Sequence, residues 1–314
     1  MSFQHTTQLR DGITYHQLIN SRTDESISLI PELGGTIASI RLQATGAPKE
    51  WLVFDDADKV RTNPLFRGRF LFPFNDRIPK ARYTFDGTTH QLPVNSPDDG
   101  SAIHGFLHQM PMRIADVRTD EDAASMRLEA RIAPTDFPGY PFAIQLAITY
   151  VLDAKGVTLR FDIANPSQRP VPFALGWHPY FALDTEATTL MASYERFVEV
   201  DDALLPTRQL LPTAQTPLDF SCGQPLEGMS VDLGFTAPAD GITRLRHRDA
   251  QLEIHQDTAL FPYTQLYIPE DGRSIAIEPI TAATNSFNFQ ELGLRVLDAG
   301  QSVQGAVRIR CHTP

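Results

Sequence analysis

The chain has 314 residues, 42% hydrophobic and 21% charged, a composition typical of a folded globular protein rather than a disordered one. Its formal net charge of −11, with no basic stripe, argues against a nucleic-acid-binding protein. The N-terminus has neither a basic start nor an apolar run, and no apolar stretch reaches the length of a membrane span. We therefore expect a cytoplasmic protein with no membrane partner.

Short runs of alternating apolar and polar residues recur along the whole chain and predict β-strands. In the stretch 157–165, large apolar residues alternate with Thr158, Arg160 and Asp162, and the loop 153–156 joins this strand to the preceding one as a hairpin. The predicted strands are 26–33, 36–42, 125–133, 142–152, 157–165, 251–257, 274–280 and 304–311.

Helices are not predicted, because no run combines a helical period with caps, and the 24 prolines argue against long helices. The pattern favours an all-β sandwich or barrel. No Gly/Ser-rich linker, charge block or fixed repeat divides the chain, so we expect one domain over 1–314. The turn-rich stretch 206–228 is interpreted as a long surface crossover.

The two cysteines, Cys222 and Cys311, form no Cys-x-x-Cys motif, which argues against a zinc knuckle or a thioredoxin-like site. Free thiols agree with a reducing compartment, and a single disulfide between the two is the alternative.

The first candidate site residue is Arg77, at a polar corner within 71–87. A guanidinium there can donate two hydrogen bonds to a hydroxylated ligand, whereas the plain alternative is a surface arginine paired with an acid. The nearby basic residues could instead form a phosphate-binding rim if they converge. These residues are Arg67, Arg69, Lys80 and Arg82.

The segment "SAIHGFLHQ" (101–109) contains His104 and His108. Two histidines four residues apart can bind zinc from a helix, but Gly105 weakens a helix and the glutamate of the zinc-protease motif is missing, so we predict no metal site. Gly105 favours a bend that brings the backbone close to a ligand. The alternative for His104 is a histidine at a loop corner.

The segment "FALGWHPYFA" (173–182) places His178 among aromatic residues. It is either a core histidine with a satisfied hydrogen bond or a proton-transfer group in a pocket. In the second case Trp177, Tyr180 and Phe181 would shape and dry that pocket.

Glu278 follows the apolar run "SIAI" directly, and Pro279 is expected to end the ladder of backbone hydrogen bonds there. A carboxylate in such a place is desolvated, which raises its pKa and makes it a better base near neutral pH, while the alternative is a solvated glutamate at a strand end.

Gln265, in "YTQLYIP", offers a donor and an acceptor to sugar hydroxyls. Asp232 lies beside apolar residues, and a structural role is the alternative for both side chains.

Taken in order, these segments resemble the aldose 1-epimerase family, the galactose mutarotases. The resemblance runs from about Ile27 to the C-terminus, and its His-Gly, His-Pro-Tyr-Phe and Glu-Pro elements are specific together. The segments that carry it are "PELGGTIASIRL", "FPFNDRI", "YTFDG", "LPVN", "AIHGF", "NPSQRPVPFALGWHPYF", "YTQLYIP" and "IAIEPITAATN".

The resemblance implies a large single-domain antiparallel β-sandwich that binds a sugar in a groove. It implies that Glu278 is the general base and His178 the general acid, on opposite sides of the sugar, with no cofactor. It also implies that His104, Arg77, Asp232 and Gln265 bind the sugar hydroxyls. Asp76 stands where the family usually has asparagine, and we expect its carboxylate to compete with the substrate for the neighbouring arginine.

The predicted activity is the interconversion of the α and β anomers of a hexose. The alternatives are a mutarotase for hexose 6-phosphates, a non-catalytic sugar-binding module of the same fold, and a glycoside hydrolase that uses Glu278 and Asp232 as its two carboxylates. We expect a monomer or a weak homodimer.

Overall fold

The computed structural model describes residues 2–56, 59–183 and 188–314, and within these residues nearly all regular structure is antiparallel β-sheet. The prediction of an all-β fold is confirmed. All eight predicted strands are present, with ends that differ by at most three residues. In the described residues the helices are short 3₁₀ turns, and none has the length and apolar character that a membrane crossing needs. They are η1 (Pro31–Leu33), η2 (Pro79–Ala81), η3 (Leu107–Gln109) and η4 (Gln290–Leu292).

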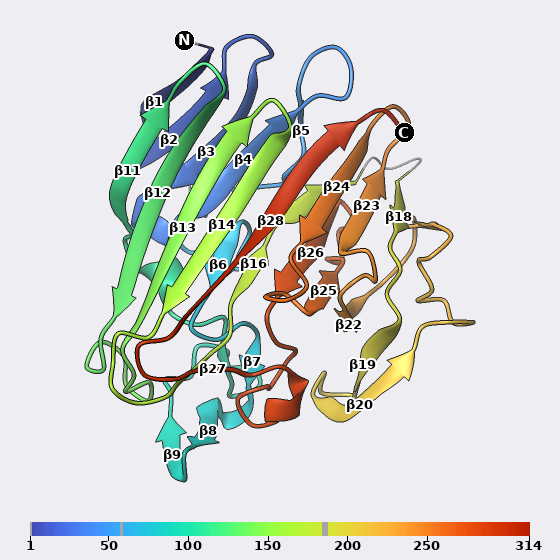
Figure 1. The fold of residues 1–314 in the computed structure, drawn as a ribbon. Helices are drawn as coiled ribbons and strands as arrows, with labels where there is room; N and C mark the ends of the chain where they lie inside the picture. Colours follow the sequence, from blue (N-terminus) through green and yellow to red (C-terminus); the bar gives the residue numbers. More distant parts are fainter. Residues whose placement is uncertain (1, 57–58, 184–187) are drawn as a thin grey trace.

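Three large sheets form the molecule (Figure 1). The five-stranded sheet follows the chain order and contains β1 (Phe3–Arg10), β2 (Ile13–Asn20), β3 (Glu25–Ile30), β4 (Thr36–Leu42) and β5 (Lys49–Glu50). The nine-stranded sheet has the order β11 (Arg113–Thr119), β12 (Ala123–Ile132), β13 (Ile144–Asp153), β14 (Gly156–Ala164), β28 (Ser302–His312), β24 (Gln251–Gln256), β23 (Ile242–Arg246), β18 (Thr189–Met191) and β21 (Gln224–Pro225).

The eight-stranded sheet carries most of the site described below. Its order is β20 (Pro206–Pro212), β19 (Arg196–Val200), β22 (Asp232–Thr236), β25 (Tyr263–Tyr267), β26 (Ser274–Ile280), β16 (Gly176–His178) and β6 (Arg69–Leu71), with β17 (Tyr180–Ala182) also pairing with β26. Three strand pairs complete the fold: β7 (Arg77–Ile78) with β10 (Ala102–Ile103), β8 (Arg82–Phe85) with β9 (Thr88–Gln91), and β15 (Val171–Phe173) with β27 (Arg295–Leu297).

Most of the core is one large hydrophobic cluster with residues from Phe3 to Ile309, and two smaller clusters lie beside it. Phe70 on β6 illustrates the contact between the eight- and nine-stranded sheets. Its ring centroid lies 6.1 Å from that of Tyr150 on β13 and 5.9 Å from that of Phe161 on β14. The alternation read in 157–165 places one face of β14 in this cluster, because the apolar residues of that run are buried.

One expectation needs correction, and one alternative is contradicted. The stretch 206–228 does cross from one sheet to another, but it begins as β20 at the edge of the eight-stranded sheet and ends as β21 at the edge of the nine-stranded sheet. Both cysteines are free thiols, and burial raises the pKa of Cys311 to about 12.

The strand β26 has the predicted bounds, but its pairing with β25 does not end at Pro279, as expected, and continues to Ile280. Every second backbone nitrogen of a strand points to the same side. The N–H of Thr281, two residues after Pro279, donates to Leu175 O, so the nitrogen of Pro279 points to that side of β26 as well. On that side β26 pairs with β17 only up to Ala276 and with β16 only at Ile280. Proline therefore fits here, because no ladder bond requires its missing N–H.

Candidate active site

A cavity of about 240 Å³ brings together all six predicted site residues. The side chains come from segments up to two hundred residues apart in the sequence, and the eight-stranded sheet supplies four of them. The six residues are Arg77 (β7), His104 (after β10), His178 (β16), Asp232 (β22), Gln265 (β25) and Glu278 (β26).

Strand register sets the floor of the cavity. Glu278 pairs with Gln265 across β26 and β25, and Gln265 pairs with Gly234 on β22. Residues directly opposite in antiparallel strands project to the same face, so Glu278 and Gln265 stand side by side. A Cβ atom at Gly234 would lie 3.2 Å from Gln265 Oε1. Because glycine has no Cβ atom, the space beside the Gln265 side chain stays open.

His178 and Glu278 meet in this cavity, with 3.4 Å between Nε2 and Oε1. Both side chains are almost fully buried, at 7% and 4% exposure. The two groups are thus direct neighbours on one wall, not on opposite sides of the cavity as expected. This geometry can still serve one hemiacetal, because the C1 hydroxyl oxygen and the ring oxygen are bonded to the same carbon atom.

Alternation along β16 and β17 explains why a histidine points into the cavity from an aromatic segment. The His178 ring stacks on Tyr180, with centroids 5.0 Å apart, and both residues line the cavity. Trp177 and Phe181 point the other way into the hydrophobic core, where Trp177 lies near Phe70. The expectation that these two residues shape the pocket is therefore wrong, because neighbouring residues in a strand face opposite sides.

Burial disfavours the charged forms of both partners. Desolvation raises the pKa of Glu278 well above its usual value, and the negative charges of Asp76 and Asp232 raise it further. Desolvation lowers the pKa of His178 to about 3. The carboxyl group is therefore a stronger base than an exposed glutamate, and the imidazole is a stronger acid than an exposed histidine once it carries a proton.

His104 is oriented by the main chain of the neighbouring segment. Its Nδ1 accepts a hydrogen bond of 3.2 Å from the backbone N–H of Asp76, and its ring meets the His178 ring edge to face at 5.3 Å. Desolvation, followed by the charge of His178, keeps the pKa of His104 well below its usual value. In the neutral ring the proton is then on Nε2, which can donate to a ligand hydroxyl.

The bend at Gly105 has a different purpose from the expected one. Gly105 adopts φ +67°, and a Cβ atom there would lie 2.2 Å from the carbonyl oxygen of Phe72. The close approach is therefore to the chain at Phe72, not to a ligand. It fixes the position of His104, which itself adopts φ +65°.

Arg77 is held by an acid, but not by the expected one. Its Nε lies 2.8 Å from Oδ2 of Asp99 in an ion pair. The carboxylate of Asp76 instead accepts hydrogen bonds from the Arg77 backbone N–H and from the Thr284 hydroxyl. The competitor for the guanidinium is thus Asp99, because the Asp76 oxygens are already engaged.

Asp232 and Gln265 form one polar unit. Gln265 Nε2 donates to Asp232 Oδ1 at 2.8 Å, which leaves Gln265 Oε1 as a buried acceptor without a partner among the described residues. Desolvation, followed by the charge of Asp76, raises the pKa of Asp232. A sugar hydroxyl can supply the donor that this amide oxygen lacks.

The four basic residues considered for phosphate binding do not converge on the cavity. Arg69 is buried elsewhere and donates to Leu33 O and Thr36 Oγ1. Arg67 is paired with Asp55 at 2.8 Å. Lys80 and Arg82 are exposed, and the described lining of the cavity contains none of the four. Their proximity in sequence did not reveal that their side chains point in different directions.

Sequence reasoning missed several lining residues. Thr284 and Asp76 add polar atoms, and Tyr267 lies on the same face of β25 as Gln265, as the alternation in 263–267 predicts. The apolar wall carries no recognisable motif and comes from separate loops and strands: Leu65, Phe66, Ile103, Val198, Val200, Leu204 and Leu233. Among the described residues, no group of three or more His, Cys, Asp or Glu side chains is arranged to hold a metal ion.

Comparison with known proteins identifies the family and the fold. The family model described as aldose 1-epimerase matches residues 18–310. The chain belongs to the aldose 1-epimerase family. The fold of this family member is similar to that of a galactose mutarotase-like protein from Clostridium acetobutylicum, with a TM-score of 0.86, 16% identity and coverage of 100% of this chain and 99% of the other. Galactose 1-epimerase from Lactobacillus acidophilus gives a TM-score of 0.81 at 17% identity, covering 99% and 98% of the two chains.

Relatives matched by sequence have higher identities but cover less of the chain. The uncharacterized protein YihR of Escherichia coli is 25% identical over 74% of this chain and 75% of its own length. Maltose epimerase of Levilactobacillus brevis is 30% identical over 51% of this chain and 48% of its own length. Human galactose mutarotase is 26% identical over 51% and 46%. The chain thus matches about half the length of the last two relatives.

Proposed function

We propose that this family member is an aldose 1-epimerase that interconverts the α and β anomers of an unphosphorylated hexose. The observation that carries the proposal is the direct contact of 3.4 Å between a buried imidazole and a buried carboxyl group in a cavity large enough for one sugar ring. Glu278 is the general base and His178 the general acid. The free thiols support a cytoplasmic location, and a monomer or weak homodimer remains our expectation.

Ring opening needs two proton transfers at neighbouring oxygens. Glu278 takes the proton of the C1 hydroxyl while His178 gives a proton to the ring oxygen, and the bond between C1 and the ring oxygen breaks to leave an aldehyde. Rotation about the C1–C2 bond presents the other face of the aldehyde. Re-closure reverses the two transfers and returns the protons to their starting groups.

The pair needs only one proton for this cycle. A neutral carboxyl group beside a neutral imidazole and a carboxylate beside an imidazolium contain the same number of protons. Desolvation favours the first arrangement in the empty cavity, and the reaction uses the second. Shifting this proton across the 3.4 Å contact prepares the site with no proton from the solvent and no cofactor.

The other four side chains supply complementary partners for sugar hydroxyls. Arg77 and the Nε2–H of His104 can donate, whereas Asp232 and the free Oε1 of Gln265 can accept. Donors and acceptors thus line different parts of the same cavity.

The shortage of unpaired cationic groups in the described lining of the cavity favours a neutral substrate over a hexose 6-phosphate. Asp76, Asp232 and Glu278 line it, and the guanidinium of Arg77 is paired with Asp99. A phosphate group needs several convergent cationic donors, and none of the four candidates is in the described lining.

Anomer exchange of glucose and galactose, followed by NMR with the spontaneous rate subtracted, tests this proposal. We expect acceleration by the wild-type protein and a loss of about 10²- to 10⁴-fold in Glu278→Gln. The exposed Glu270→Gln is the matched control and should keep the full rate.

Three further samples separate the alternatives. Faster turnover of glucose 6-phosphate than of glucose would favour the phosphosugar enzyme. Release of nitrophenol from a nitrophenyl glycoside would favour a hydrolase. Sugar binding without acceleration by folded wild-type protein would leave only a binding module and contradict the proposal.

A further inference from the structure

Two large apolar side chains of the cavity wall lie on left-handed backbone. Among the described non-glycine residues in this conformation, the two with large apolar side chains are Phe66, at φ +55°, and Leu204, at φ +56°. Both line the cavity of the candidate active site. A bulky residue rarely adopts a positive φ, and strained backbone is concentrated at functional sites. The position of these two side chains therefore indicates a role in the cavity.

The turn 63–67 holds Phe66 in place through the side chain of its first residue. The Phe66 N–H donates to Asn63 O at 3.0 Å, and the Arg67 N–H donates to Asn63 Oδ1 at 2.7 Å. Asn63 Nδ2 closes the turn by donating to Arg67 O at 2.9 Å. The half-buried Phe66 ring meets the His104 ring edge to face, with centroids 4.5 Å apart.

The turn 201–205 holds Leu204 with the same arrangement of hydrogen bonds. The Leu204 N–H donates to Asp201 O at 2.9 Å, and the Leu205 N–H donates to Asp201 Oδ1 at 3.0 Å. The backbone N–H of Asp201 closes the turn by donating to Leu205 O at 2.9 Å. In both turns the left-handed apolar residue is thus the fourth of five and is fixed by an amide or carboxylate side chain.

The two turns approach the cavity from opposite edges of the eight-stranded sheet. The turn 201–205 joins β19 to β20 at one edge, and the turn 63–67 leads into β6 at the other. Between these edges run β22, β25 and β26, which carry Asp232, Gln265 and Glu278. The polar floor formed by these three residues therefore lies between two apolar side chains.

A pyranose has hydroxyl groups around its rim and C–H groups on its faces, so a site that fits it needs both polar and apolar walls. We propose that Phe66 and Leu204 bind the C–H surfaces of the aldose from opposite sides, while the polar floor binds its hydroxyl groups. The inference rests on the proposed function, because that function makes an aldose the ligand of the cavity. It assigns the two residues to substrate binding and not to the proton transfers.

The first test is the dissociation constant of galactose and of glucose, each at its anomeric equilibrium, followed by NMR titration of the protein. Phe66→Ala and Leu204→Ala should each weaken binding by about 5- to 30-fold, because apolar contact with the sugar is lost. A dissociation constant within about twofold of wild type in either variant overturns the proposal.

The matched control for this titration is Gln215→Asn. Gln215 is exposed and left-handed, with φ +64°, but it is not among the described lining residues of the cavity. This variant should bind both sugars as tightly as wild-type protein does. A loss equal to that of Leu204→Ala would show that a substitution at any such turn weakens binding, and it would overturn the proposal.

Phe66 also touches the His104 ring, so a second readout separates contact with the sugar from positioning of the histidine. In protein with ¹³C-labelled phenylalanine rings and leucine methyl groups, nuclear Overhauser effects should connect Phe66 and Leu204 to C–H protons of the bound sugar. The signals are assigned by their loss in the alanine variants. The absence of either contact at saturating sugar overturns the proposal.

Leu204→Asn decides the question if Phe66→Ala fails to fold. Asparagine tolerates left-handed backbone better than leucine, and the Leu204 residue is 39% exposed. The variant should therefore unfold at a urea concentration no lower than wild type, yet bind the sugar as weakly as Leu204→Ala. A lower urea midpoint, or binding as tight as wild type, overturns the proposal. Binding is measured without turnover, so wild-type protein that binds the sugar but does not accelerate anomer exchange contradicts the proposed function alone.

Discussion

At the scale of one residue, the backbone conformation at Gly105 positions the ring of His104 in the site. The carbonyl oxygen of Phe72 accepts the N–H groups of Phe106 and Leu107, at 2.8 and 3.0 Å, and this contact requires the chain to pass close at Gly105. The left-handed bend then continues back through His104 and turns its ring toward the cavity. A histidine in this conformation is rarely found without such support.

Gly105→Ala is predicted to destabilise the protein by about 3 kcal/mol or more, because it adds a backbone clash to the cost of a left-handed alanine. Gly100→Ala is the matched control. Gly100 has φ +69°, close to the +67° of Gly105, but a Cβ atom there meets nothing within 4 Å. This variant should lose only about 1 kcal/mol, as measured by urea unfolding. Equal losses in the two variants would contradict the proposed clash.

The sequence could predict which residues are candidates, but not the direction in which each points. Glu278 after an apolar run and His178 among aromatics both conflict with their surroundings, which is the signal of a buried functional group. Their contact at 3.4 Å joins residues one hundred positions apart and needed the resemblance to be anticipated. The burial of Arg69 was not predictable, because a buried arginine that binds carbonyl oxygens has the same local pattern as an exposed one.

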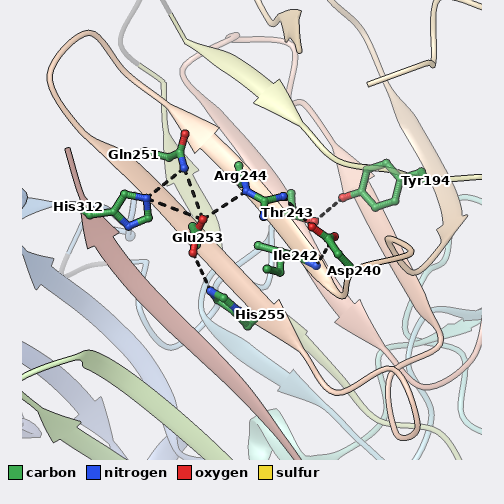
Figure 2. A network of polar contacts seen from close by, with 9 residues as sticks. All are labelled: Tyr194, Asp240, Ile242, Thr243, Arg244, Gln251, Glu253, His255 and His312. Carbon is green, nitrogen blue, oxygen red and sulfur yellow. Dashed lines mark hydrogen bonds and ion pairs between the residues drawn. The ribbon is translucent and has the colours of Figure 1, made fainter. Parts of the chain in front are cut away.

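At the scale of strands, a polar network lies on β23, β24 and β28, away from the cavity (Figure 2). Glu253 is its centre and is 15% exposed. Its Oε2 lies 2.8 Å from His255 Nε2, and its Oε1 lies 3.2 Å from Arg244 Nε and 3.7 Å from His312 Nε2. The network connects three neighbouring strands through their side chains.

The network predicts a pH-dependent contribution to stability. Burial alone would raise the pKa of Glu253, but the His255 hydrogen bond and the charges of His255, His312 and Arg244 outweigh it and keep the pKa below its usual value. A carboxyl group with a depressed folded-state pKa stabilises the fold above its unfolded pKa of about 4.3, and the contribution is lost as pH falls through the folded value.

Glu253→Gln should therefore unfold at lower urea concentration than wild type near pH 7, with a difference of about 1 kcal/mol. The difference should shrink as pH falls below about 4. The exposed Glu227→Gln serves as the control and should follow wild type at each pH. A difference that stays constant or grows on acidification would contradict this account of the network.

At the scale of the whole molecule, the last strand, β28, joins two groups of strands into the single nine-stranded sheet. β28 pairs with β14 on one side and with β24 on the other, so the C-terminal residues lie at the centre of the nine-stranded sheet. Figure 1 shows β28 crossing the broad layer of long strands between these neighbours. The continuous core cluster includes residues from both sides of this strand.

A single domain predicts a single cooperative unfolding transition. In scanning calorimetry we expect one endotherm whose calorimetric and van't Hoff enthalpies agree. Two separable transitions, or a ratio of calorimetric to van't Hoff enthalpy well above one, would show that the chain contains two units.

Alternation was enough to predict eight of the strands and the all-β class, because period two is a local property of the sequence. The division into sheets was not predictable in this way, since β16, β25 and β26 pair across gaps of up to one hundred residues. The order of strands in each sheet depends on long-range contacts that no short segment encodes.

The central claim is that Glu278 and His178 act as one proton-transfer unit on a single hemiacetal. The most direct test is the anomer-exchange rate of Glu278→Gln, His178→Asn and the double variant, measured by NMR on the same aldose. Residues that act as a unit are not additive, so the double variant should be about as slow as the slower single variant. Losses that multiply in the double variant, or a full rate in either single variant, would contradict the claim.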